Sequence, residues 1–318
     1  MDRPGAVTLL RTAVGAFAAA HDGERWCVAL SGGADSLALT AVAATLRPTV
    51  ALIVDHGLQP DSAEIACAAQ RQALELGCVA AQVLTVTVGT DGGPEAAART
   101  ARYRALDEAR AGAPVLLGHT LDDQAETVLL GLGRGSGARS IAGMRDYDAP
   151  WGRPLLTVRR TVTRAACAEL GLLPWEDPHN TDPRFTRVRL RTEVLPLLEE
   201  VLGGGVADAL ARTGAALRED AEALDALAAR ALVEVRRGDG LDVTGLGGLP
   251  SAVRRRVIRS WLLDGGARDL TSAQIHRVDA LVTDWRGQGG VAVTSPLRRV
   301  RLFAARRDGM LTMHTEPV

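Results

Sequence analysis

The chain of 318 residues has a hydrophobic content of 47% and a formal net charge of −1, which indicates a globular protein long enough for two domains. It contains no lysine, so any mechanism that forms a Schiff base or a lysyl–AMP intermediate on the enzyme is excluded. The apolar runs are too short to cross a bilayer and the N-terminus lacks the order of a signal peptide, so we expect a cytoplasmic protein with no membrane partner.

The first predicted elements are a helix over residues 1–24 and a short apolar strand that ends at residue 31. A glycine pair and a helical apolar pattern follow, which predicts a tight turn and a helix N-terminus. Backbone N–H groups of glycine can converge on a phosphate at such a turn, and the helix dipole adds to the attraction. The neighbouring serines and aspartate favour an anion site over a turn that binds nothing, and the lack of lysine excludes a Walker A loop. The residues of this loop are Ser31, Gly32, Gly33, Ala34, Asp35 and Ser36.

A second buried strand is predicted over residues 50–54, with Asp55 and His56 directly after it. Ligands bind at the carboxyl edge of open α/β sheets, so both residues are binding candidates, although they could simply end the strand. A helix over 61–77, a third strand over 83–88 and a helix over 95–110 follow. Arg102 lies in the last of these helices, where the arginines form either a solvated basic face or a phosphate contact.

The segment over residues 115–130 predicts a fourth strand that leads into a helix with a histidine and three acids at its start. Thr120 and Asp123 approximate a capping box, which gives Asp123 a structural explanation. Asp122 and Glu126 are four residues apart and share a helix face, where their repulsion is tolerable if a cation lies between them. The alternative is that acids merely favour a helix N-terminus.

A glycine-rich loop over 131–143 and a helix over 163–170 come next. Residues 175–191 are polar, punctuated by proline and rich in arginine, which is typical of a functional loop that closes a site. Its candidate substrate-binding residues are Arg187, Arg189 and Arg191.

The character of the chain changes after residue 202, so we predict domains over 1–202 and 203–318. A glycine run at 203–205 precedes a long amphipathic helix over 206–237, which Gly214 is expected to bend or break. Helices near 252–263 and 272–285 and strands over 291–294, 300–304 and 310–314 complete the prediction. Residues 250–318 hold 12 arginines against 6 acids, which suggests an RNA-facing domain, the alternative being a solvated basic face.

Six motifs, taken together and in order, resemble those of the tRNA(Ile)-lysidine synthetase family of PP-loop ATP pyrophosphatases. They are Ser-Gly-Gly-Ala-Asp-Ser, Asp-His-Gly-Leu, Ala-Arg-x-Ala-Arg-Tyr, Gly-His-Thr-Leu-Asp-Asp-Gln-Ala-Glu-Thr, Arg-Gly-Ser-Gly and Glu-Asp-Pro-x-Asn-x-Asp-x-x-Phe-x-Arg. The match covers about residues 25–200, and the histidine–acid motif is its most specific part. Gln59 and Val188 depart from the pattern, since arginine and asparagine are frequent there.

The resemblance implies a Rossmann-like parallel sheet with helices on both faces, followed by a smaller, mainly helical α+β domain. It implies that the chain uses ATP and Mg²⁺ to adenylate the C2 oxygen of the cytidine at the first anticodon position of tRNA(Ile) with a CAU anticodon. Free L-lysine then displaces AMP. The amine of lysine has an unperturbed pKa of about 10.4 and must lose its proton. A carboxylate could hold the ammonium and accept that proton, and Asp122, Asp123 and Glu126 are the candidates.

The resemblance also implies site residues, although it leaves open which acid serves the lysine amine and which the metal. The expected catalytic residues are Asp35, His119, Asp122, Asp123 and Glu126, with Asp35 as the metal ligand. The phosphate loop with Asp55 and His56 is expected to bind ATP. Arg102, Asp122, Glu126 and the three arginines of the polar loop are expected to bind substrates.

Three alternative functions and the oligomeric state stay open at this point. The chain could be a tRNA thiolase, although its four cysteines lack the Cys-x-x-Cys pair that such an enzyme would need for a metal cluster. It could also be an amidotransferase-type synthetase, or a non-catalytic nucleotide-gated RNA-binding protein. A homodimer is one assembly that the sequence allows.

Overall fold

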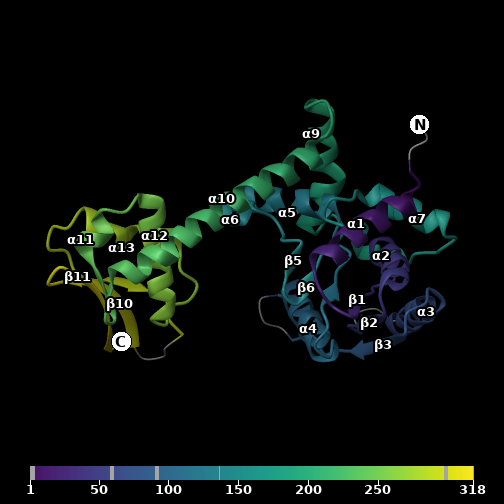
Figure 1. Cartoon of the computed structure of the whole chain (residues 1–318), viewed down its shortest axis with the longest axis horizontal. Helices are drawn as coiled ribbons and strands as arrows, with labels where there is room; N and C mark the ends of the chain where they lie inside the picture. Colours follow the sequence, from purple (N-terminus) through teal and green to yellow (C-terminus); the bar gives the residue numbers. More distant parts are fainter. Residues whose placement is uncertain (1–3, 58–60, 90–92, 136, 297–299, 318) are drawn as a thin grey trace. The chain divides into compact units, whose positions relative to one another are not determined.

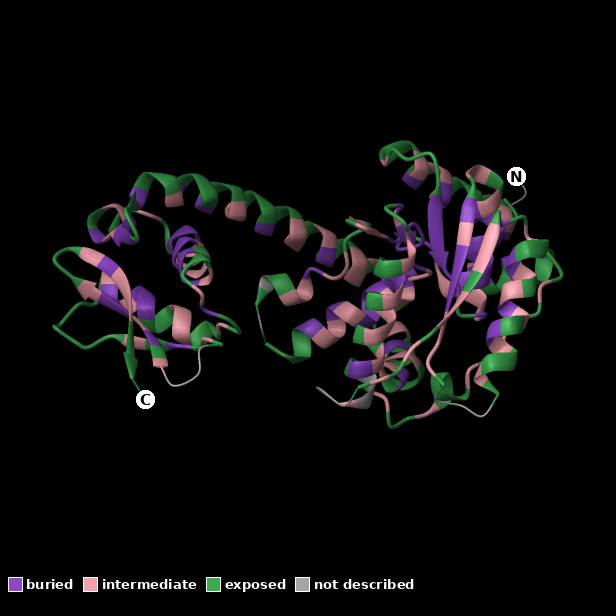
Figure 2. Cartoon of the chain, turned by 90° about the horizontal axis from the view of Figure 1, so that it is seen from below, coloured by how far each residue is buried: buried purple, intermediate pink, exposed green. Residues whose placement is uncertain are grey.

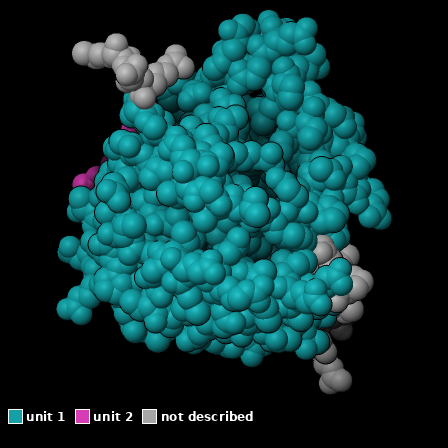
Figure 3. All heavy atoms as spheres, turned by 90° about the vertical axis from the view of Figure 1, so that its right-hand side faces the viewer, with its two compact units in different colours: residues 1–135, 140–214 teal, residues 136–139, 215–318 magenta. Residues whose placement is uncertain are grey.

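The computed structural model describes all residues except 1–3, 58–60, 90–92, 136, 297–299 and 318, so Gln59 lies outside the described residues. The chain folds into two compact units (Figure 1). Figure 3 shows mainly the surface of the first unit. The first comprises residues 1–135 and 140–214, and the second comprises residues 136–139 and 215–318. No helix in the described ranges has both the length and the apolarity to span a bilayer.

The first unit is built on a six-stranded sheet with the order β3-β2-β1-β4-β6-β5. All neighbouring strands are parallel except β5 and β6, which form an antiparallel edge. The strands are β1 (Trp26–Ala29), β2 (Thr49–Asp55), β3 (Ala80–Thr85), β4 (Val115–Leu116), β5 (Tyr147–Asp148) and β6 (Trp151–Gly152). Every residue of β1 and β4 is buried, and the central strands are largely purple in Figure 2. This burial on both faces explains why the sequence shows continuous apolar runs there.

Helices cover both faces of this sheet because successive strand residues point to opposite sides. Val28 and Leu116 pack into a cluster that includes residues of α1, α2, α3 and α7, whereas Cys27 and Val115 pack into a cluster that includes Leu106 of α4. The helices are α1 (Ala6–Ala20), α2 (Ala34–Leu46), α3 (Ser62–Glu75), α4 (Pro94–Ala109), α5 (Leu121–Gly133), α6 (Ala138–Ile141) and α7 (Arg160–Glu169). The predicted α/β fold with helices on both faces is confirmed.

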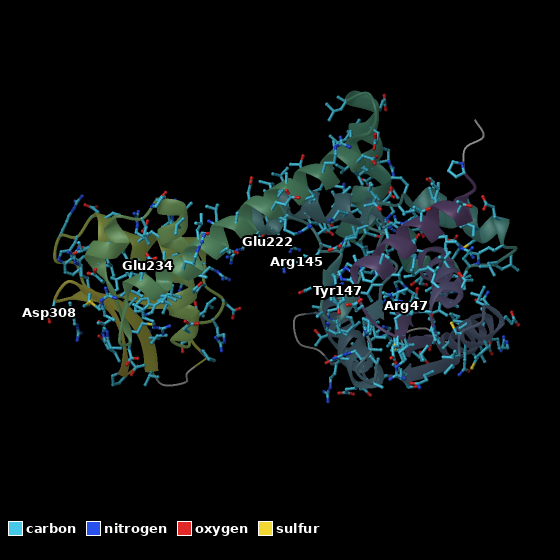
Figure 4. The ribbon with its side chains drawn as sticks, viewed as in Figure 1. Arg47, Arg145, Tyr147, Glu222, Glu234 and Asp308 are labelled. Atoms are coloured by element: carbon cyan, nitrogen blue, oxygen red, sulfur yellow. The ribbon has the colours of Figure 1, made fainter. Side chains whose placement is uncertain are left out.

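Arg47, labelled in Figure 4, shows how α1 is fixed against the start of the sheet. Its guanidinium lies 5.0 Å from the ring centroid of Trp26, at the start of β1. It also donates hydrogen bonds to the carbonyl oxygens of Ala18 at 2.5 Å and His21 at 3.1 Å, at the C-terminal end of α1. One arginine therefore satisfies two carbonyl groups that the end of α1 leaves without helical partners.

Several boundaries differ from the prediction. The third strand covers Ala80–Thr85 instead of 83–88, because its alanine-rich start pairs in register with β2. The polar segment after α7 becomes helical earlier than expected: a 3₁₀ turn (Pro178–Thr181) is followed by α8 (Thr186–Arg189), a π-helical turn (Leu190–Val194) and α9 (Leu195–Val201). Within these helices Arg189 and Glu193 pair at a spacing of four residues, which supports a helix where the charge density suggested a loop.

The second unit combines helices with a five-stranded antiparallel sheet of order β7-β8-β11-β10-β9. Its helices are α11 (Val243–Gly247), α12 (Ser251–Asp264) and α13 (Ser272–Thr283), together with the second part of α10 (Val206–Val235). Its strands are β7 (Arg236–Arg237), β8 (Gly240–Asp242), β9 (Val291–Val293), β10 (Val300–Arg307) and β11 (Met310–Pro317). Trp261 of α12 is fully buried in the core of this unit.

The long helix α10 contributes to the core of each unit. Ala207 packs with Leu121 and Leu195 in the first unit, and Ala228 packs in the second. The division between the units falls after residue 214, inside this helix, and not at the glycine run before it. The expected break at Gly214 is absent because α10 is continuous. A β-carbon there would lie 3.0 Å from Cγ2 of Val128, so the glycine permits close packing.

Candidate active site

The loop between β1 and α2 is held in shape by its own glycines and serines. Gly32 has a φ of +82°, a backbone conformation that favours glycine. Ser36 Oγ accepts a hydrogen bond from the N–H of Ser31 at 3.2 Å and donates one to the carbonyl oxygen of Gly33 at 3.0 Å. The loop therefore presents backbone at the N-terminus of α2, where an anion is favoured.

A cavity of about 250 Å³ lies at the carboxyl ends of β1 and β2, next to this loop. Asp55 and His56 line it from the end of β2, and Trp175, Asp177 and His179 line it from the segment after α7. Nδ1 of His56 is buried and has no hydrogen-bond partner in the described part of the chain. Burial, and then the charge of Arg102, lower the pKa of His56. A neutral imidazole with an unused nitrogen is suited to a polar group of a ligand.

A second cavity, of about 410 Å³, adjoins the first and is more highly charged. The two share Ala29, Ser31, Arg102 and Trp175 in their linings, so a single extended ligand could occupy both. The charged and titratable residues that line the second cavity are Asp35, Arg102, His119, Asp123, Arg160, Arg164, Glu176 and Arg191. Three expected catalytic residues, Asp35, His119 and Asp123, are therefore brought together.

Arg102 is the half-buried cation at the junction of the two cavities. It makes no hydrogen bond or ion pair with another described residue, and burial lowers its pKa. A desolvated guanidinium without a carboxylate partner is stabilised by a bound anion, and its fork of N–H donors matches a phosphate. Of the two roles that the sequence left open for Arg102, this position favours the phosphate contact over the solvated face.

Asp35 joins the phosphate loop to a cluster of charges centred on Arg160. Its Oδ1 accepts a hydrogen bond from the hydroxyl of Thr163, and its Oδ2 accepts one from Nε of Arg160 at 3.1 Å. The same guanidinium contacts Asp123 Oδ1 at 2.6 Å and Glu126 Oε1 at 3.5 Å. Burial raises the pKa of Asp35, whereas Arg160 and Thr163 oppose that effect. Burial disfavours the charge of Arg160, but the carboxylates of Asp123, Asp35 and Glu126 raise its pKa.

Asp123 has both a structural and a cavity-facing role. Its Oδ2 accepts hydrogen bonds from the N–H and the hydroxyl of Thr120, both at 2.8 Å, so the predicted capping box is present. Its Oδ1 faces Arg160. Burial acts against this carboxylate, but Arg160 and the N–H of Thr120 hold the pKa of Asp123 below its ordinary value. His119, next to it, has its pKa lowered to about 4 by burial, and its Nδ1 has no partner among the described residues.

Asp122 and Glu126 differ from Asp123 because neither lines a cavity that we describe here. Asp122 Oδ2 accepts a hydrogen bond from the N–H of Arg160 at 2.7 Å, and Oδ1 pairs with Arg159 at 3.1 Å. Glu126 is fully buried, and its Oε1 pairs with Nε of Arg191 at 2.8 Å. Arginines of the protein therefore already lie beside the two acids that the sequence placed on one face.

The three arginines of the polar segment lie in different surroundings. Arg191 lines the second cavity, and Arg187 lies 3.8 Å from Oε2 of Glu126. Arg189 pairs with Glu193 on the surface, outside both cavities. Val188, one of the departures from the family pattern, is buried and so replaces a polar side chain with packing.

Sequence reasoning missed two residues that shape this site. Arg160 was overlooked because the helix that carries it was expected to begin at residue 163, which left Arg159 and Arg160 in a loop. Trp175 donates its backbone N–H to the carbonyl oxygen of Gly32 at 3.0 Å and lines both cavities. The only available signal was its position directly before the Glu176–Asp177 motif.

The fit of the site to Mg²⁺ rests on Asp35. This ion usually keeps several waters and binds through one or two carboxylates together with substrate phosphates. Asp35 supplies one carboxylate beside the phosphate loop, which suits such a shared site. The described residues contain no group of three histidine, cysteine or acidic side chains placed to hold a metal by themselves.

The phosphate loop, the sheet edge and Arg102 converge on two adjoining cavities, which makes the first unit a nucleotide-binding domain of the PP-loop class. Residues 8–198 match the PP-loop domain family, and residues 241–306 match the TilS substrate binding domain family. The tRNA(Ile)-lysidine synthases of Mycolicibacterium paratuberculosis and Mycobacterium tuberculosis are 71% and 68% identical to this chain, each over the full length of both chains. The chain belongs to the tRNA(Ile)-lysidine synthase family.

Membership makes the chain an ATP-using ligase that forms a carbon–nitrogen bond in tRNA modification. Among solved structures, the U34-tRNA thiolase NcsA from Methanococcus maripaludis, with its 4Fe-4S cluster, has a TM-score of 0.54 at 18% identity. That similarity covers 67% of this chain and 80% of the thiolase and shows a shared fold alone.

Proposed function

We propose that this chain attaches the side-chain amine of free L-lysine to C2 of the first anticodon cytidine of tRNA(Ile) with a CAU anticodon. The observation that carries the proposal is the convergence of the phosphate loop, of Arg102, which has no carboxylate partner among the described residues, and of the carboxylates of Asp35 and Asp123 on adjoining cavities. A nucleotide bound on the loop would lie beside the acids that the two steps need.

In the first step ATP adenylates the C2 oxygen of cytidine, which turns a poor leaving group into a good one. The nucleoside occupies the first cavity near Asp55 and His56, and the phosphates lie on the loop and Arg102. Asp35 would hold Mg²⁺, which neutralises charge on the departing pyrophosphate. The loop N–H groups and Arg102 stabilise the same charge from the protein side.

In the second step lysine displaces AMP, and its ammonium must first lose a proton. Asp123 is the proposed partner of the ammonium because it is the member of the acid trio that lines the cavity. His119 lies in the same lining and is neutral at pH 7, so its Nδ1 is proposed as a hydrogen-bond acceptor for the substrate and not as the base, because a group with a pKa of about 4 holds a proton weakly. Asp122 and Glu126 orient the arginines around Asp123.

We propose that the second unit binds the tRNA substrate. We also propose that the enzyme is cytoplasmic and forms a homodimer, which gel filtration would detect. The long helix shows where a truncation that tests this role must end. Ending the chain before residue 206 would remove Ala207 from the core of the first unit, so the truncated chain should end at residue 214. We expect that chain to keep ATP binding and to lose most of its affinity for tRNA.

The decisive experiment incubates the full-length protein with ATP, labelled lysine and unmodified tRNA bearing the CAU anticodon. We expect label in the tRNA, with one AMP and one pyrophosphate for each lysine incorporated. A thiolase or an amidotransferase-type synthetase would leave lysine unincorporated, and a non-catalytic RNA-binding protein would release no pyrophosphate. Replacing the CAU anticodon with GAU should abolish incorporation, because the reactive cytidine is then absent.

A further inference from the structure

Arg160 lies in the space that a cationic substrate would need. Its guanidinium contacts Asp35 and Glu126 at 3.1 and 3.5 Å and Asp123 at 2.6 Å, and the side chain is only 16% exposed. The helix that carries it, α7, is fixed at this point, because the N–H of Arg160 donates to Asp122. The arginine therefore connects the acid of the phosphate loop with the acids of α5.

The carboxylates near the second cavity have little capacity left for another cation. Asp123 directs Oδ2 to Thr120 and Oδ1 to Arg160 at 2.6 Å, with Arg191 farther from the same oxygen at 3.6 Å. Glu126 is fully buried against Arg191 and Arg160. An ammonium group that reaches Asp123 Oδ1 must take the place of the nearer guanidinium, that of Arg160. The protein thus carries its own cation at the position proposed for the lysine ammonium.

We propose that Arg160 is a positioning residue that sets the order of binding, so that lysine reaches Asp123 only after phosphate groups have occupied the loop. The inference rests on the proposed function. Asp35 lies two residues after Gly33, in the first turn of α2, so a pyrophosphate on the loop brings negative charge close to the guanidinium that Asp35 holds. Arg160 then moves toward the phosphate and leaves Asp123 to the lysine ammonium.

This order suits the proposed reaction, because lysine is of use only when a nucleotide is bound. An arginine that blocks Asp123 until phosphates occupy the loop keeps the ammonium away from that carboxylate while the site holds no nucleotide. The guanidinium is always charged at physiological pH, so the block depends on its position and not on its protonation.

Equilibrium dialysis with labelled lysine tests the proposal on the full-length protein. With inorganic pyrophosphate and Mg²⁺ present, the natural protein should bind lysine at least about tenfold more tightly than without them, the effect of about one charge-assisted hydrogen bond. Arg160→Gln should bind lysine equally well in both conditions. Arg104→Gln is the matched control, because Arg104 is an exposed arginine that pairs with Glu108 outside the site, and it should behave like the natural protein.

Measurements on the natural protein alone can refute the proposal, so the test does not depend on whether the variant is stable. Lysine binding that is independent of pyrophosphate, or a pyrophosphate effect that survives in Arg160→Gln, would overturn it. Arg160→Lys keeps the positive charge but replaces the guanidinium with a single ammonium group, so it should retain part of the effect of pyrophosphate on lysine binding. A protein that forms lysidine but shows no coupling refutes only this inference, whereas a protein that forms no lysidine refutes the proposed function.

Discussion

Asp35 touches both the phosphate loop and the Arg160 cluster, and it is the proposed metal ligand. Asp35→Asn keeps the shape of the side chain and removes its charge, so pyrophosphate release in the presence of ATP and tRNA should fall by about 100-fold or more. Circular dichroism should show an intact fold, because Arg160 retains Asp123 and Glu126 as partners. Near-normal lysine incorporation would remove Asp35 from the mechanism, and a large fall in Tm would indicate a structural role.

Asp123 and Asp122 are adjacent in sequence but face different surroundings, which permits a matched comparison. Asp123→Asn keeps an acceptor for Thr120 and loses the charge in the cavity, so the KM for lysine should rise about tenfold while pyrophosphate release changes less. Asp122→Asn alters a carboxylate outside the cavity that acts on this KM only through the arginines it orients, so the rise should be clearly smaller than for Asp123→Asn. Equal losses in both steps for Asp123→Asn would mean that the nucleotide or the metal is its partner.

His119 makes the stability of the fold depend on pH in a predictable direction. Burial lowers its pKa to about 4 from an ordinary value of 6.5, so between these values the unfolded chain binds more protons than the folded one. The free energy of unfolding should therefore fall as the pH drops from about 6.5 to 4, by up to about 3 kcal/mol from this residue. Urea unfolding at pH 7, 5.5 and 4.5 should show a shallower fall for His119→Gln, and identical pH dependence in both proteins would contradict the assignment.

At the scale of elements, the sequence predicted best where one local pattern decides the structure. The predictions of β2 from its continuous apolar run and of the capping box of α5 are both confirmed, because burial on two faces and an N-cap each require particular residue types at fixed positions. The two-residue strands β5 and β6 were missed, since such short strands show no periodicity and depend on the edge that they join. The same reason explains which site residues could be predicted: Asp35 and Asp123 lie in sequence motifs, whereas Arg160 contacts them only through the tertiary structure.

Two glycines of α5 give opposite predictions for the same substitution. A β-carbon on Gly131 would overlap the backbone carbonyl of Ser140, whereas one on Gly133 would have no atom within 4 Å. Gly131→Ala should therefore destabilise the protein by about 1–3 kcal/mol, and Gly133→Ala should stabilise it by up to about 1 kcal/mol through helix propensity. Urea unfolding of both variants checks the pair, and equal effects would show that α5 and the Ser140 backbone are not packed as described.

At the scale of the whole molecule, the distribution of arginines matters more than their number. Residues 250–318 hold 12 arginines and 6 acids although the chain as a whole has a net charge of −1. Many of these arginines are already neutralised: Arg254 is buried in a pair with Asp279, and Arg286 pairs with Asp284 on the surface. Replacing Arg254 would leave an uncompensated buried carboxylate and destabilise the unit, so it does not test RNA binding.

Three arginines of the second unit lie around one acid of α10. Asp225 Oδ1 lies 2.6 Å from Arg139 and 2.9 Å from Arg256, and the nearby Arg259 makes no hydrogen bond or ion pair with another described residue. Burial, and then the charge of Arg139, lower the pKa of Arg259, and Asp225 opposes them only in part because it is already paired with Arg139 and Arg256. A backbone phosphate of tRNA would supply the missing negative charge.

The salt dependence of tRNA binding tests whether Arg259 contacts such a phosphate in the full-length protein. Each phosphate contact contributes about 0.7 to 0.9 to the slope of log affinity against log salt, because binding releases condensed counterions. Arg259→Gln should lower the magnitude of the slope by about that amount, and it should weaken binding most at low salt. Arg286→Gln, which removes the same charge from an exposed pair, should leave the slope unchanged. Equal slopes for Arg259→Gln and the natural protein would show that this cluster is a solvated face, and the arginines near the active site would then be the next candidates for contact with the tRNA.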